Sequence, residues 1–245
     1  MISFCKNQIF IVTGASSGLG KATALLLNKL GASVVAIARR ESKLQLLKSE
    51  CEYPENLHIE VKDLAKDIES LPKYVKELKE KYGKFTGLAC CAGLGGVISL
   101  QAMEMENMKA TFDINYYAPV FMTKGFVDRR CNIGKGASVV AIASAGAISC
   151  DPGMVCYSGS KGALISSMKV ISREVVKQGI RVNTVSPTLI ETDMAGELEK
   201  EYAQGKYPLG IGEPYDVANL IVFLLSDKAK WITSQNYIID CGAMA

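Results

Sequence analysis

The sequence predicts an α/β fold, with one doubly wound parallel sheet and helices packed on both of its faces. Short apolar runs rich in Val, Ile and Ala alternate with segments of helical periodicity along the whole chain. This alternation is typical of consecutive β-α-β units, which build parallel sheets. No linker, internal repeat or low-complexity segment interrupts the pattern in 245 residues. We therefore expect a single domain over residues 1–245.

Each predicted strand is an apolar run of five to seven residues, followed by turn residues or by a helical pattern. The predicted strands are residues 8–13, 33–38, 57–61, 86–91, 138–144, 180–186 and 234–240. Glycines such as Gly31 and Gly83 end the predicted helices, and Pro214 begins the last one. The predicted helices are residues 21–30, 41–50, 67–82, 103–130 (with a kink at Pro119), 154–178 and 214–225, and a loop with a short helix is expected over 187–206.

The composition indicates a globular protein with a substantial core, because 49% of the residues are hydrophobic and 22% are charged. The net charge of +3 is small and dispersed, so we expect neither nucleic acid nor a membrane surface as a partner. No apolar run approaches the roughly 18 residues of a membrane span. Residues 1–8 run directly into a strand pattern and lack the plan of a signal peptide. We expect a cytoplasmic protein.

The cysteines and the one histidine argue against several other kinds of site. The eight cysteines are scattered apart from the adjacent Cys90 and Cys91, and none has the spacing of metal ligands. We therefore expect reduced thiols, without a disulfide framework or a metal site. No nucleophile elbow accompanies the single histidine, His58, which argues against a Ser-His-Asp hydrolase.

A glycine-rich turn, with Gly14, Gly18 and Gly20, joins the first predicted strand to the first helix. Glycines in this position let the backbone approach a pyrophosphate at a helix N-terminus, although an ordinary tight turn is the alternative. The second strand is followed by Arg39 and Arg40 rather than by a carboxylate that would repel a 2′-phosphate. Because guanidinium groups bind phosphate well, we predict NADP(H) over NAD(H), with Arg39 as the main ligand. Two solvated arginines at a helix start are the alternative.

Tyr157 and Lys161 are four residues apart in a predicted helix, a spacing that places both side chains on one face. A cation about 4 Å from the phenol favours the phenolate by at most about 4 kcal/mol at an effective dielectric constant of about 20, and desolvation opposes this effect. The pair therefore predicts a phenol suited to general acid catalysis. Ser144 ends a predicted strand, where open α/β sheets bind ligands. An ordinary surface Tyr–Lys pair beside a core serine is the alternative.

Together these motifs resemble those of the short-chain dehydrogenase/reductase family over essentially the whole chain. Residues 13–20 match the family's T-G-x-x-x-G-x-G, and Asp63 matches its adenine-binding aspartate. Residues 187–194 match the segment that closes on the nicotinamide carboxamide. Residues 208–218 and 231–242 resemble the 3-oxoacyl-(acyl-carrier-protein) reductase branch. The catalytic tetrad of the family corresponds to Asn115, Ser144, Tyr157 and Lys161.

The resemblance implies a Rossmann-type fold and an oxidoreductase in which Tyr157 is the general acid. Ser144 would bind the substrate carbonyl, Lys161 would also hold the nicotinamide ribose, and Asn115 would position a relay water. We expect Ala145, Gly146, Cys150 and Met154 to line the substrate pocket, together with a substrate loop of about residues 188–206. The residues expected at the cofactor are Gly14, Ser16, Ser17, Gly18, Leu19, Gly20, Arg39, Arg40, Asp63, Leu64, Cys91, Ala92, Gly93, Tyr157, Lys161, Pro187, Thr188, Ile190 and Thr192.

Several positions depart from the family pattern. Cys90 and Cys91 replace two asparagines, and thiols are poor hydrogen-bond partners, which predicts weaker cofactor binding or a less stable sheet. The other departures are Ser17 in place of a basic residue, Thr188 and Cys241 in place of glycines, and Ile211 in place of an arginine. They leave the chemistry intact but loosen the assignment to one substrate.

The sequence thus predicts an NADPH-dependent oxidoreductase that reduces a ketone to a secondary alcohol, with 3-oxoacyl-(acyl-carrier-protein) reductase as one candidate. An alcohol or sugar dehydrogenase of a secondary pathway and a non-catalytic NADP-sensing protein are the alternatives. The expected partners are a small-molecule carbonyl substrate and, by family resemblance, further copies in a homodimer or homotetramer. An acyl carrier protein is a candidate partner, for which Arg129 and Arg130 offer a basic rim.

Overall fold

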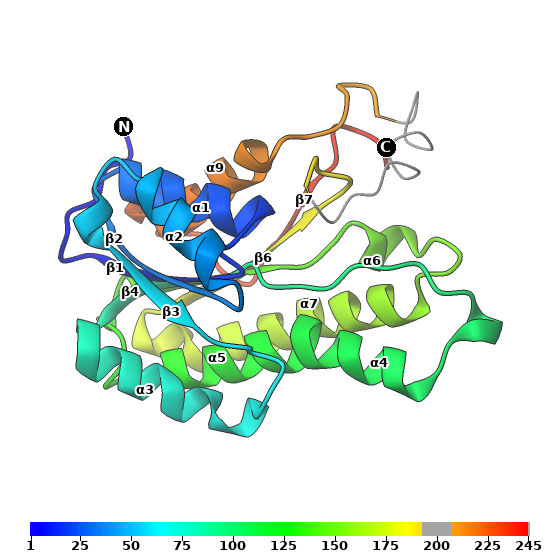
Figure 1. Cartoon of the computed structure of the whole chain (residues 1–245), viewed down its shortest axis with the longest axis horizontal. Coiled ribbons are helices and arrows are strands. Elements are labelled where there is room, and N and C mark those ends of the chain that lie inside the picture. The colour runs from blue at the N-terminus through cyan, green and yellow to red at the C-terminus, as the bar shows by residue number, and fades with distance from the viewer. Residues whose placement is uncertain (193–206, 245) are drawn as a thin grey trace.

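The computed structural model describes residues 1–192 and 207–244, and seven parallel strands form the sheet at its centre (Figure 1). The strand order is β3-β2-β1-β4-β5-β6-β7, and every neighbouring pair is parallel. The strands are β1 (Ile9–Thr13), β2 (Ser33–Ala38), β3 (Leu57–Val61), β4 (Phe85–Cys90), β5 (Ser138–Ile142), β6 (Arg181–Pro187) and β7 (Asn236–Ile239). This arrangement confirms the predicted doubly wound, Rossmann-type sheet.

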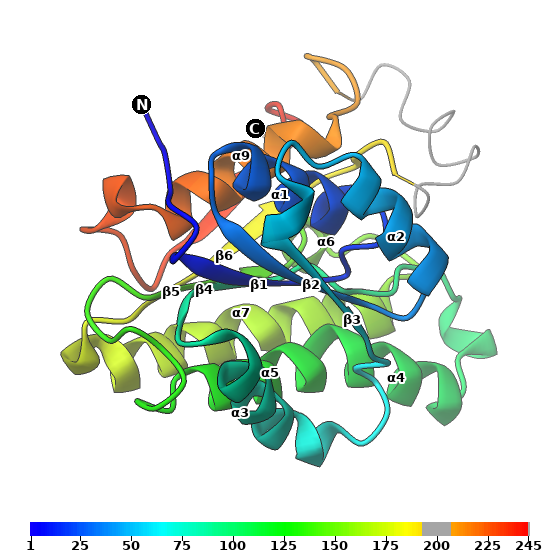
Figure 2. The ribbon, with the colours of Figure 1, turned by 60° about the vertical axis from the view of Figure 1, so that its left-hand side comes forward.

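Helices cover both faces of the sheet, as Figures 1 and 2 show from two directions. On one face lie α1 (Gly18–Lys29), α2 (Glu41–Ser49) and α9 (Pro214–Leu225). On the other lie α3 (Leu71–Tyr82), α4 (Met105–Phe112), α5 (Ala118–Phe126) and α7 (Val155–Val175). Alternate strand residues therefore enter two separate cores: Phe10 packs on the α1 side and Ile11 on the α5 side.

The order of the elements is as predicted, whereas several bounds differ. The predicted helix over 103–130 is interrupted by a π-helical segment, η4 (Asp113–Tyr117), and α5 begins next to Pro119. The kink predicted at this proline is thus a change of helix type just before it, since a proline in the first helical turn needs no N–H partner. The start predicted at 67 is a 3₁₀ turn, η2 (Ile68–Ser70), before α3. The sequence also did not reveal α6 (Gly146–Ser149).

The helix expected within 187–206 falls mainly on residues outside the described part of the chain. The described residues of this segment, 188–192, contain no helix. A β-bridge joins Ile190 to Gly212. Among the described residues, no helix has both the length and the apolar character needed to cross a membrane.

The carboxyl ends of β1 and β4 meet at the point where the strand order reverses. The Thr13 hydroxyl accepts hydrogen bonds from the backbone N–H groups of Cys91 (3.1 Å) and Ala92 (3.2 Å). A Cβ atom at Gly14 would lie 2.8 Å from the Cα atom of Ala92, so a side chain there would collide with the β4 segment. Ligands of open α/β sheets bind at such a reversal, which directs attention to this edge.

Candidate active site

A cavity of about 660 Å³ lies at the carboxyl edge of the sheet, a size typical of sites for organic ligands. Its walls come from the segments that follow β1, β2, β3, β4 and β6, with α7 on one side. Of the residues predicted at the cofactor, all except Gly20 line this cavity.

The glycine turn, residues 14–20, forms one side of the cavity and is suited to bind an anion. Gly14 (φ 68°) and Gly18 (φ 52°) adopt backbone conformations that favour glycine, and Gly20 has no room for a Cβ atom beside the Gly14 carbonyl. Helix α1 begins at Gly18 and carries no acidic residue in its first turn. Free N–H groups and the positive end of the helix dipole therefore face the cavity, and these residues fit the pyrophosphate of a dinucleotide.

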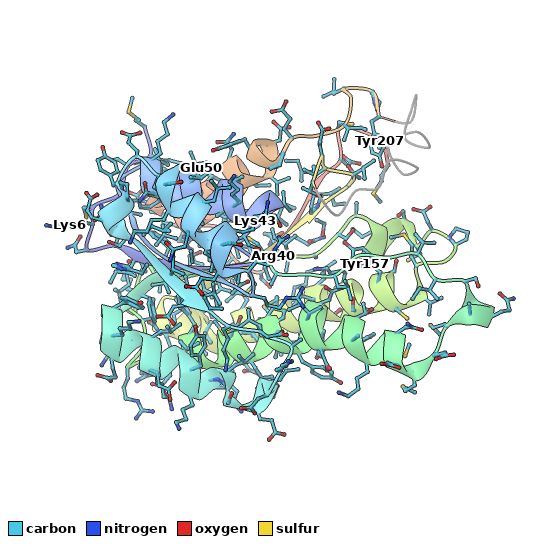
Figure 3. The ribbon with its side chains drawn as sticks, viewed as in Figure 1. Lys6, Arg40, Lys43, Glu50, Tyr157 and Tyr207 are labelled. Atoms are coloured by element: carbon cyan, nitrogen blue, oxygen red, sulfur yellow. The ribbon has the colours of Figure 1, made fainter. Side chains whose placement is uncertain are left out.

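Cations gather at the end of the cavity next to β2 and β3. Arg40, labelled in Figure 3, donates hydrogen bonds to the hydroxyls of Ser16 (3.0 Å) and Ser17 (2.8 Å). Arg39, Lys62 and Lys66 also line the cavity. Four cations at one end of a cavity suit a ligand that carries a further anionic group there.

The side chains of Tyr157 and Lys161 both line the cavity from the first turns of α7 (Figure 3 labels Tyr157). Lys161 is only 4% exposed and donates a hydrogen bond from Nζ to the Ile142 carbonyl at 2.7 Å. Burial lowers the pKa of Lys161 to about 8. A phenol and a buried amine thus line the same cavity as the glycine turn.

The other two members of the predicted tetrad, Asn115 and Ser144, are buried and adjacent in the chain to the wall residues Ile114 and Ala143. The Asn115 side chain is fully buried, exchanges hydrogen bonds with the backbone of Leu94 (2.8 and 2.9 Å) and donates one to the Ser160 hydroxyl (3.2 Å). Ser144 is 7% exposed, and its hydroxyl accepts a hydrogen bond from the Gly146 N–H at 3.1 Å. Neither residue lines the cavity among the described residues, although Ile142 and Ala143 beside Ser144 do.

The two cysteines that stand in place of asparagines have neutral thiols. Burial raises the pKa of Cys91 to about 12 and raises that of Cys90 further. Cys91 lines the cavity, while Cys90 belongs to the core on the α5 face. The backbone after β4 is also held by the Thr13 hydroxyl, through the N–H groups of Cys91 and Ala92.

Sequence reasoning missed part of the cavity wall. Ala110, Asp113 and Ile114 reach it from α4 and η4, and Lys62 and Lys66 flank the predicted Asp63. Their one signal in the sequence is their closeness to Asn115 and Asp63, which carry motifs. The remaining wall residues that were not predicted are Ile37, Ala38, Ala65, Leu94, Ile142, Ala143 and Leu189.

The predicted substrate pocket is described only in part. Met154 approaches Gly146, since a Cβ atom at Gly146 would lie 3.4 Å from the Met154 methyl and 3.3 Å from the Ser144 hydroxyl. Ala145 is buried and Cys150 is exposed. Residues 188–192 include four that line the main cavity, whereas 193–206 lie outside the described residues. A second cavity of about 120 Å³ shares Leu94, Ala110 and Tyr157 with the first.

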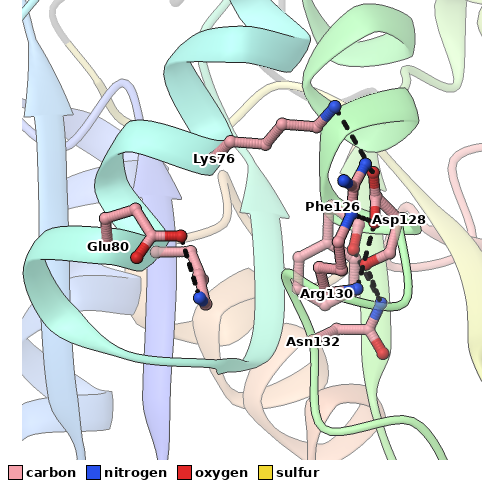
Figure 4. Close-up of polar contacts among 7 residues, drawn as sticks. Lys76, Glu80, Phe126, Asp128, Arg130 and Asn132 are labelled. Atoms are coloured by element: carbon pink, nitrogen blue, oxygen red, sulfur yellow. Dashed lines mark hydrogen bonds and ion pairs between the residues drawn. The ribbon is translucent and has the colours of Figure 1, made fainter.

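The predicted basic rim does not lie at either cavity. Arg130 pairs with Asp128 at 2.7 Å just after α5, and Lys76 approaches the same carboxylate at 3.4 Å (Figure 4). This segment precedes β5 and therefore lies at the amino edge of the parallel sheet. Arg129 and Arg130 line neither cavity. The described residues also contain no group of His, Cys, Asp and Glu able to hold a metal ion.

Comparisons with known proteins agree with this geometry. A family model described as enoyl-(acyl carrier protein) reductase matches residues 14–244. The 3-oxoacyl-(acyl-carrier-protein) reductase FabG of Rickettsia conorii is 35% identical over 238 residues, covering 96% of this chain and 95% of the relative. The L-rhamnose 1-dehydrogenase (NAD(P)(+)) of a Sphingomonas species is 30% identical over 244 residues, covering 97% and 96%.

The fold is likewise similar to that of solved structures. A short-chain dehydrogenase from Burkholderia cenocepacia, crystallised in complex with NADP, matches with a TM-score of 0.90 at 26% identity, over 98% of this chain and 99% of that one. The match of sequence and fold over nearly the full length confirms the resemblance that the motifs predict. The chain belongs to the short-chain dehydrogenase/reductase family of nicotinamide-dependent oxidoreductases, which act on CH–OH groups.

Proposed function

We propose that this oxidoreductase reduces a ketone to a secondary alcohol with NADPH, with Tyr157 as the general acid. The observation that carries this proposal is that Tyr157 and Lys161 line the same cavity as the glycine turn. The reduced nicotinamide supplies the hydride when it is bound. Tyr157 gives its proton to the oxygen of the former carbonyl, and the Lys161 ammonium stabilises the phenolate that remains.

Ser144 and Asn115 support the reaction from positions next to the wall residues Ala143 and Ile114. The Ser144 hydroxyl donates a hydrogen bond to the carbonyl oxygen on which negative charge develops. The Asn115 side chain fixes the wall segment at Leu94 and, as the family resemblance implies, the segment around it holds a relay water. The chain forms one NAD(P)-binding domain over residues 1–245, with a substrate loop at about 188–206.

The cofactor preference rests on the cations beside β2. The NADP 2′-phosphate binds Arg39 and Arg40, with Lys62 close by in the same wall. The Ser16 and Ser17 hydroxyls orient the Arg40 guanidinium without neutralising it. No carboxylate stands at positions 39 and 40 to receive the ribose hydroxyls of NAD.

A 3-oxoacyl thioester is the substrate class that suits the cavity best. Segment 91–100, which contributes to both cavities, and segment 144–150, which follows the wall residues Ile142 and Ala143, contain no charged residue. Leu94, Val97, Ile148 and Val155 in and beside these segments are between 45% and 62% exposed. Exposed apolar side chains on and beside the cavity wall favour an acyl chain over a polyol. The reductase of Rickettsia conorii supports the same choice, and an acyl carrier protein is then the natural carrier of the substrate.

A sugar dehydrogenase is the second candidate, favoured by the similarity to the L-rhamnose dehydrogenase. We further propose a homodimer or homotetramer. The cytoplasmic location and the absence of a nucleic-acid partner stay predictions from the sequence.

The test is the consumption of NADPH with acetoacetyl-CoA, compared between the natural protein and Tyr157→Phe. Loss of the phenolic proton should lower kcat by about 100-fold or more, since general acid catalysis contributes this much. The dissociation constant for NADPH, measured by fluorescence titration, should change by less than about threefold because the hydroxyl is one contact among many. A variant that keeps more than a few per cent of the natural activity would contradict the role of Tyr157.

A panel of substrates distinguishes the candidate functions. Reduction of acetoacetyl-CoA at least about tenfold more efficient than that of simple ketones, with no oxidation of L-rhamnose or polyols, supports the thioester assignment. Preferred turnover of a sugar would favour the second candidate. Binding of NADPH without turnover of any member of the panel would contradict the enzymatic proposal and favour an NADP-sensing protein.

A further inference from the structure

A chain of hydrogen bonds links the Asn115 amide to the helix that carries Tyr157 and Lys161. Asn115 Nδ2 donates to the Ser160 hydroxyl at 3.2 Å, and the Ser160 hydroxyl donates to the Tyr157 carbonyl at 2.7 Å. Both Asn115 and Ser160 are fully buried. The chain therefore joins η4 to the first turns of α7 through groups that exchange no hydrogen bonds with solvent.

The direction of each hydrogen bond in this chain is fixed by chemistry. The Tyr157 carbonyl can only accept, so the Ser160 hydroxyl donates its one proton there and accepts from Asn115. The Leu94 N–H needs an acceptor and the Leu94 carbonyl needs a donor, and both requirements orient the Asn115 amide in the same way. Loss of the Ser160 hydroxyl would leave one Asn115 N–H unpaired at a buried place, where such a group is unfavourable.

The same amide lies next to the lysine of the candidate active site. A Cβ atom at Gly93 would be 3.2 Å from Asn115 Oδ1 and 3.5 Å from Lys161 Nζ. The amide oxygen and the ammonium thus converge on one point of the cavity wall. A rotation of the Asn115 side chain would release Leu94, which lines both cavities, and would alter the surroundings of Lys161.

From this geometry we infer that Ser160 is a positioning residue, which holds the Asn115 amide and thereby the wall at Leu94 in place against Tyr157 and Lys161. The inference rests on the proposed function for its effect on turnover. Ser160 is fully buried and lines neither cavity, so it would not contact the bound cofactor directly.

The chain offers a matched control for this inference. The hydroxyls of Tyr116, in η4, and Ser167, in α7, lie 3.1 Å apart, so they join the same two elements about two helical turns further along α7. Ser167→Ala removes one hydrogen bond between these two elements but leaves all the hydrogen-bond partners of Asn115 in place. A merely structural role would give similar results for both alanine variants.

The first experiment measures NADPH-dependent reduction of acetoacetyl-CoA by the full-length variants Ser160→Ala, Ser160→Thr and Ser167→Ala. We expect Ser160→Ala to lower kcat by about tenfold or more while KM for NADPH changes less than threefold. Ser160→Thr keeps a hydroxyl at the same place and should recover most of kcat. Ser167→Ala should keep kcat within twofold. Equal effects of the two alanine variants, or no recovery by threonine in a folded protein, would overturn the inference.

A second measurement does not depend on turnover. The Leu94 N–H is bound to Asn115 Oδ1, so amide hydrogen exchange in peptides that cover residues 93–98 reports on that amide. We expect exchange there to become at least fivefold faster in Ser160→Ala and to stay unchanged in Ser167→Ala. Unchanged exchange in Ser160→Ala would overturn the inference. If the natural protein reduces no carbonyl, the proposed function fails, while this measurement still decides the role of Ser160.

Discussion

The Arg40 guanidinium is held at the cavity by two serine hydroxyls rather than by a carboxylate. A hydroxyl orients the guanidinium but does not neutralise it, so its charge stays available to an anionic ligand. At position 17 the family resemblance predicts a basic residue. Ser17 instead helps to hold the basic Arg40 side chain at the cavity.

This arrangement predicts how cofactor selectivity responds to single changes. Arg39→Ala and Arg40→Ala should each raise KM for NADPH by about tenfold, because a charge-assisted hydrogen bond contributes about 1.5–3 kcal/mol. KM for NADH should change by less than about twofold, since NADH lacks the 2′-phosphate. Steady-state kinetics with both cofactors measures the effect.

Lys43→Ala is the matched control, because Lys43 is an exposed cation on α2 (Figure 3) that does not line the cavity. An equal loss of NADPH affinity in this variant would mean that general positive charge, rather than the two arginines, sets the preference. Equal losses for NADH and NADPH in the arginine variants would contradict the 2′-phosphate assignment.

At the scale of residues, the sequence revealed the groups whose chemistry is tied to a motif. Tyr157, Lys161 and the glycine turn could be predicted because their spacing alone fixes which groups lie together. Lys62 and Asp113 could not, because they reach the cavity only once β3 has paired with β2 and η4 has packed against α7. The bonding of Asn115 to Ser160 likewise depends on the π-helical geometry, which no local pattern indicates.

At the scale of elements, one buried arginine joins β6 to the end of α9. Arg181 is 7% exposed and donates hydrogen bonds to the carbonyls of Leu224 (2.6 Å) and Ser226 (3.0 Å). These carbonyls lie at or just after the end of α9, where the negative pole of the helix and its unpaired oxygens favour a cation. The desolvation of the guanidinium lowers the pKa of Arg181, but the group stays charged.

We expect Arg181→Met to lower the free energy of unfolding by about 2 kcal/mol, because the carbonyls of Leu224 and Ser226 lose a charged donor and keep the weaker neutral donors Ser138 Oγ and Ala229 N–H. Arg181→Lys should lie between this variant and the natural protein, since an ammonium cannot reproduce the planar fork. Urea unfolding followed by circular dichroism measures both. Arg173→Met, on an exposed part of α7, serves as the control and should change stability by less than about 0.5 kcal/mol. An Arg181→Met variant as stable as this control would rule out the capping role.

The helix predicted over 103–130 shows where element-scale prediction stops. Its apolar periodicity and Pro119 indicated one kinked helix, and the chain instead forms α4, η4 and α5. The interruption is stabilised by tertiary hydrogen bonds of the Asn115 side chain to Leu94 and Ser160, which periodicity cannot reveal. By contrast, β2, β3 and α9 have the predicted bounds, because glycine, proline or charged residues mark their ends.

At the scale of the whole molecule, the burial of Lys161 lowers the stability of the fold in order to place an amine in the candidate active site. Desolvation lowers the pKa of this amine from 10.5 to about 8, so at neutral pH the folded protein holds a charged group in an unfavourable place. Only the hydrogen bond to the Ile142 carbonyl compensates for it among the hydrogen bonds described here. A buried charge whose pKa is shifted by desolvation is typical of a functional site.

Lys161→Met should therefore abolish activity and yet raise the free energy of unfolding at pH 7 by about 1–3 kcal/mol, as when other buried charges are replaced by apolar groups. With a pKa lower in the folded chain than in the unfolded one, the natural protein regains stability as the pH rises from about 8 to 10.5. The advantage of the variant should be complete below pH 8 and shrink across that window.

Chemical unfolding of both proteins between pH 6 and about pH 10 measures this difference. Lys169→Met, on the exposed side of the same helix, is the control and should show no such pH dependence. A Lys161→Met protein that is less stable than the natural one at pH 7 would show that the hydrogen bond to Ile142 outweighs desolvation.

The fold as a whole could be predicted because alternating strand and helix patterns leave few topologies open. Alternation alone does not give the strand order. The order also depends on β4 pairing with the free side of β1, and the glycine turn indicates a binding site at the end of β1 but does not specify this pairing. The two-sided core follows from the alternation of side chains in β1, where Phe10 and Ile11 enter opposite layers.

The Thr13 hydroxyl accepts hydrogen bonds from two consecutive N–H groups, and this determines which substitutions are tolerated nearby. At Gly14 any side chain would collide with Ala92, and at Thr13 the loss of the hydroxyl would take away the acceptor of the Cys91 and Ala92 N–H groups. The thiols of Cys90 and Cys91 do not hold these two backbones together, so we expect small uncharged side chains of several kinds to be tolerated at both positions. Random mutagenesis with selection for cofactor binding should accordingly find many substitutions at the thiol pair and very few at the threonine and glycine.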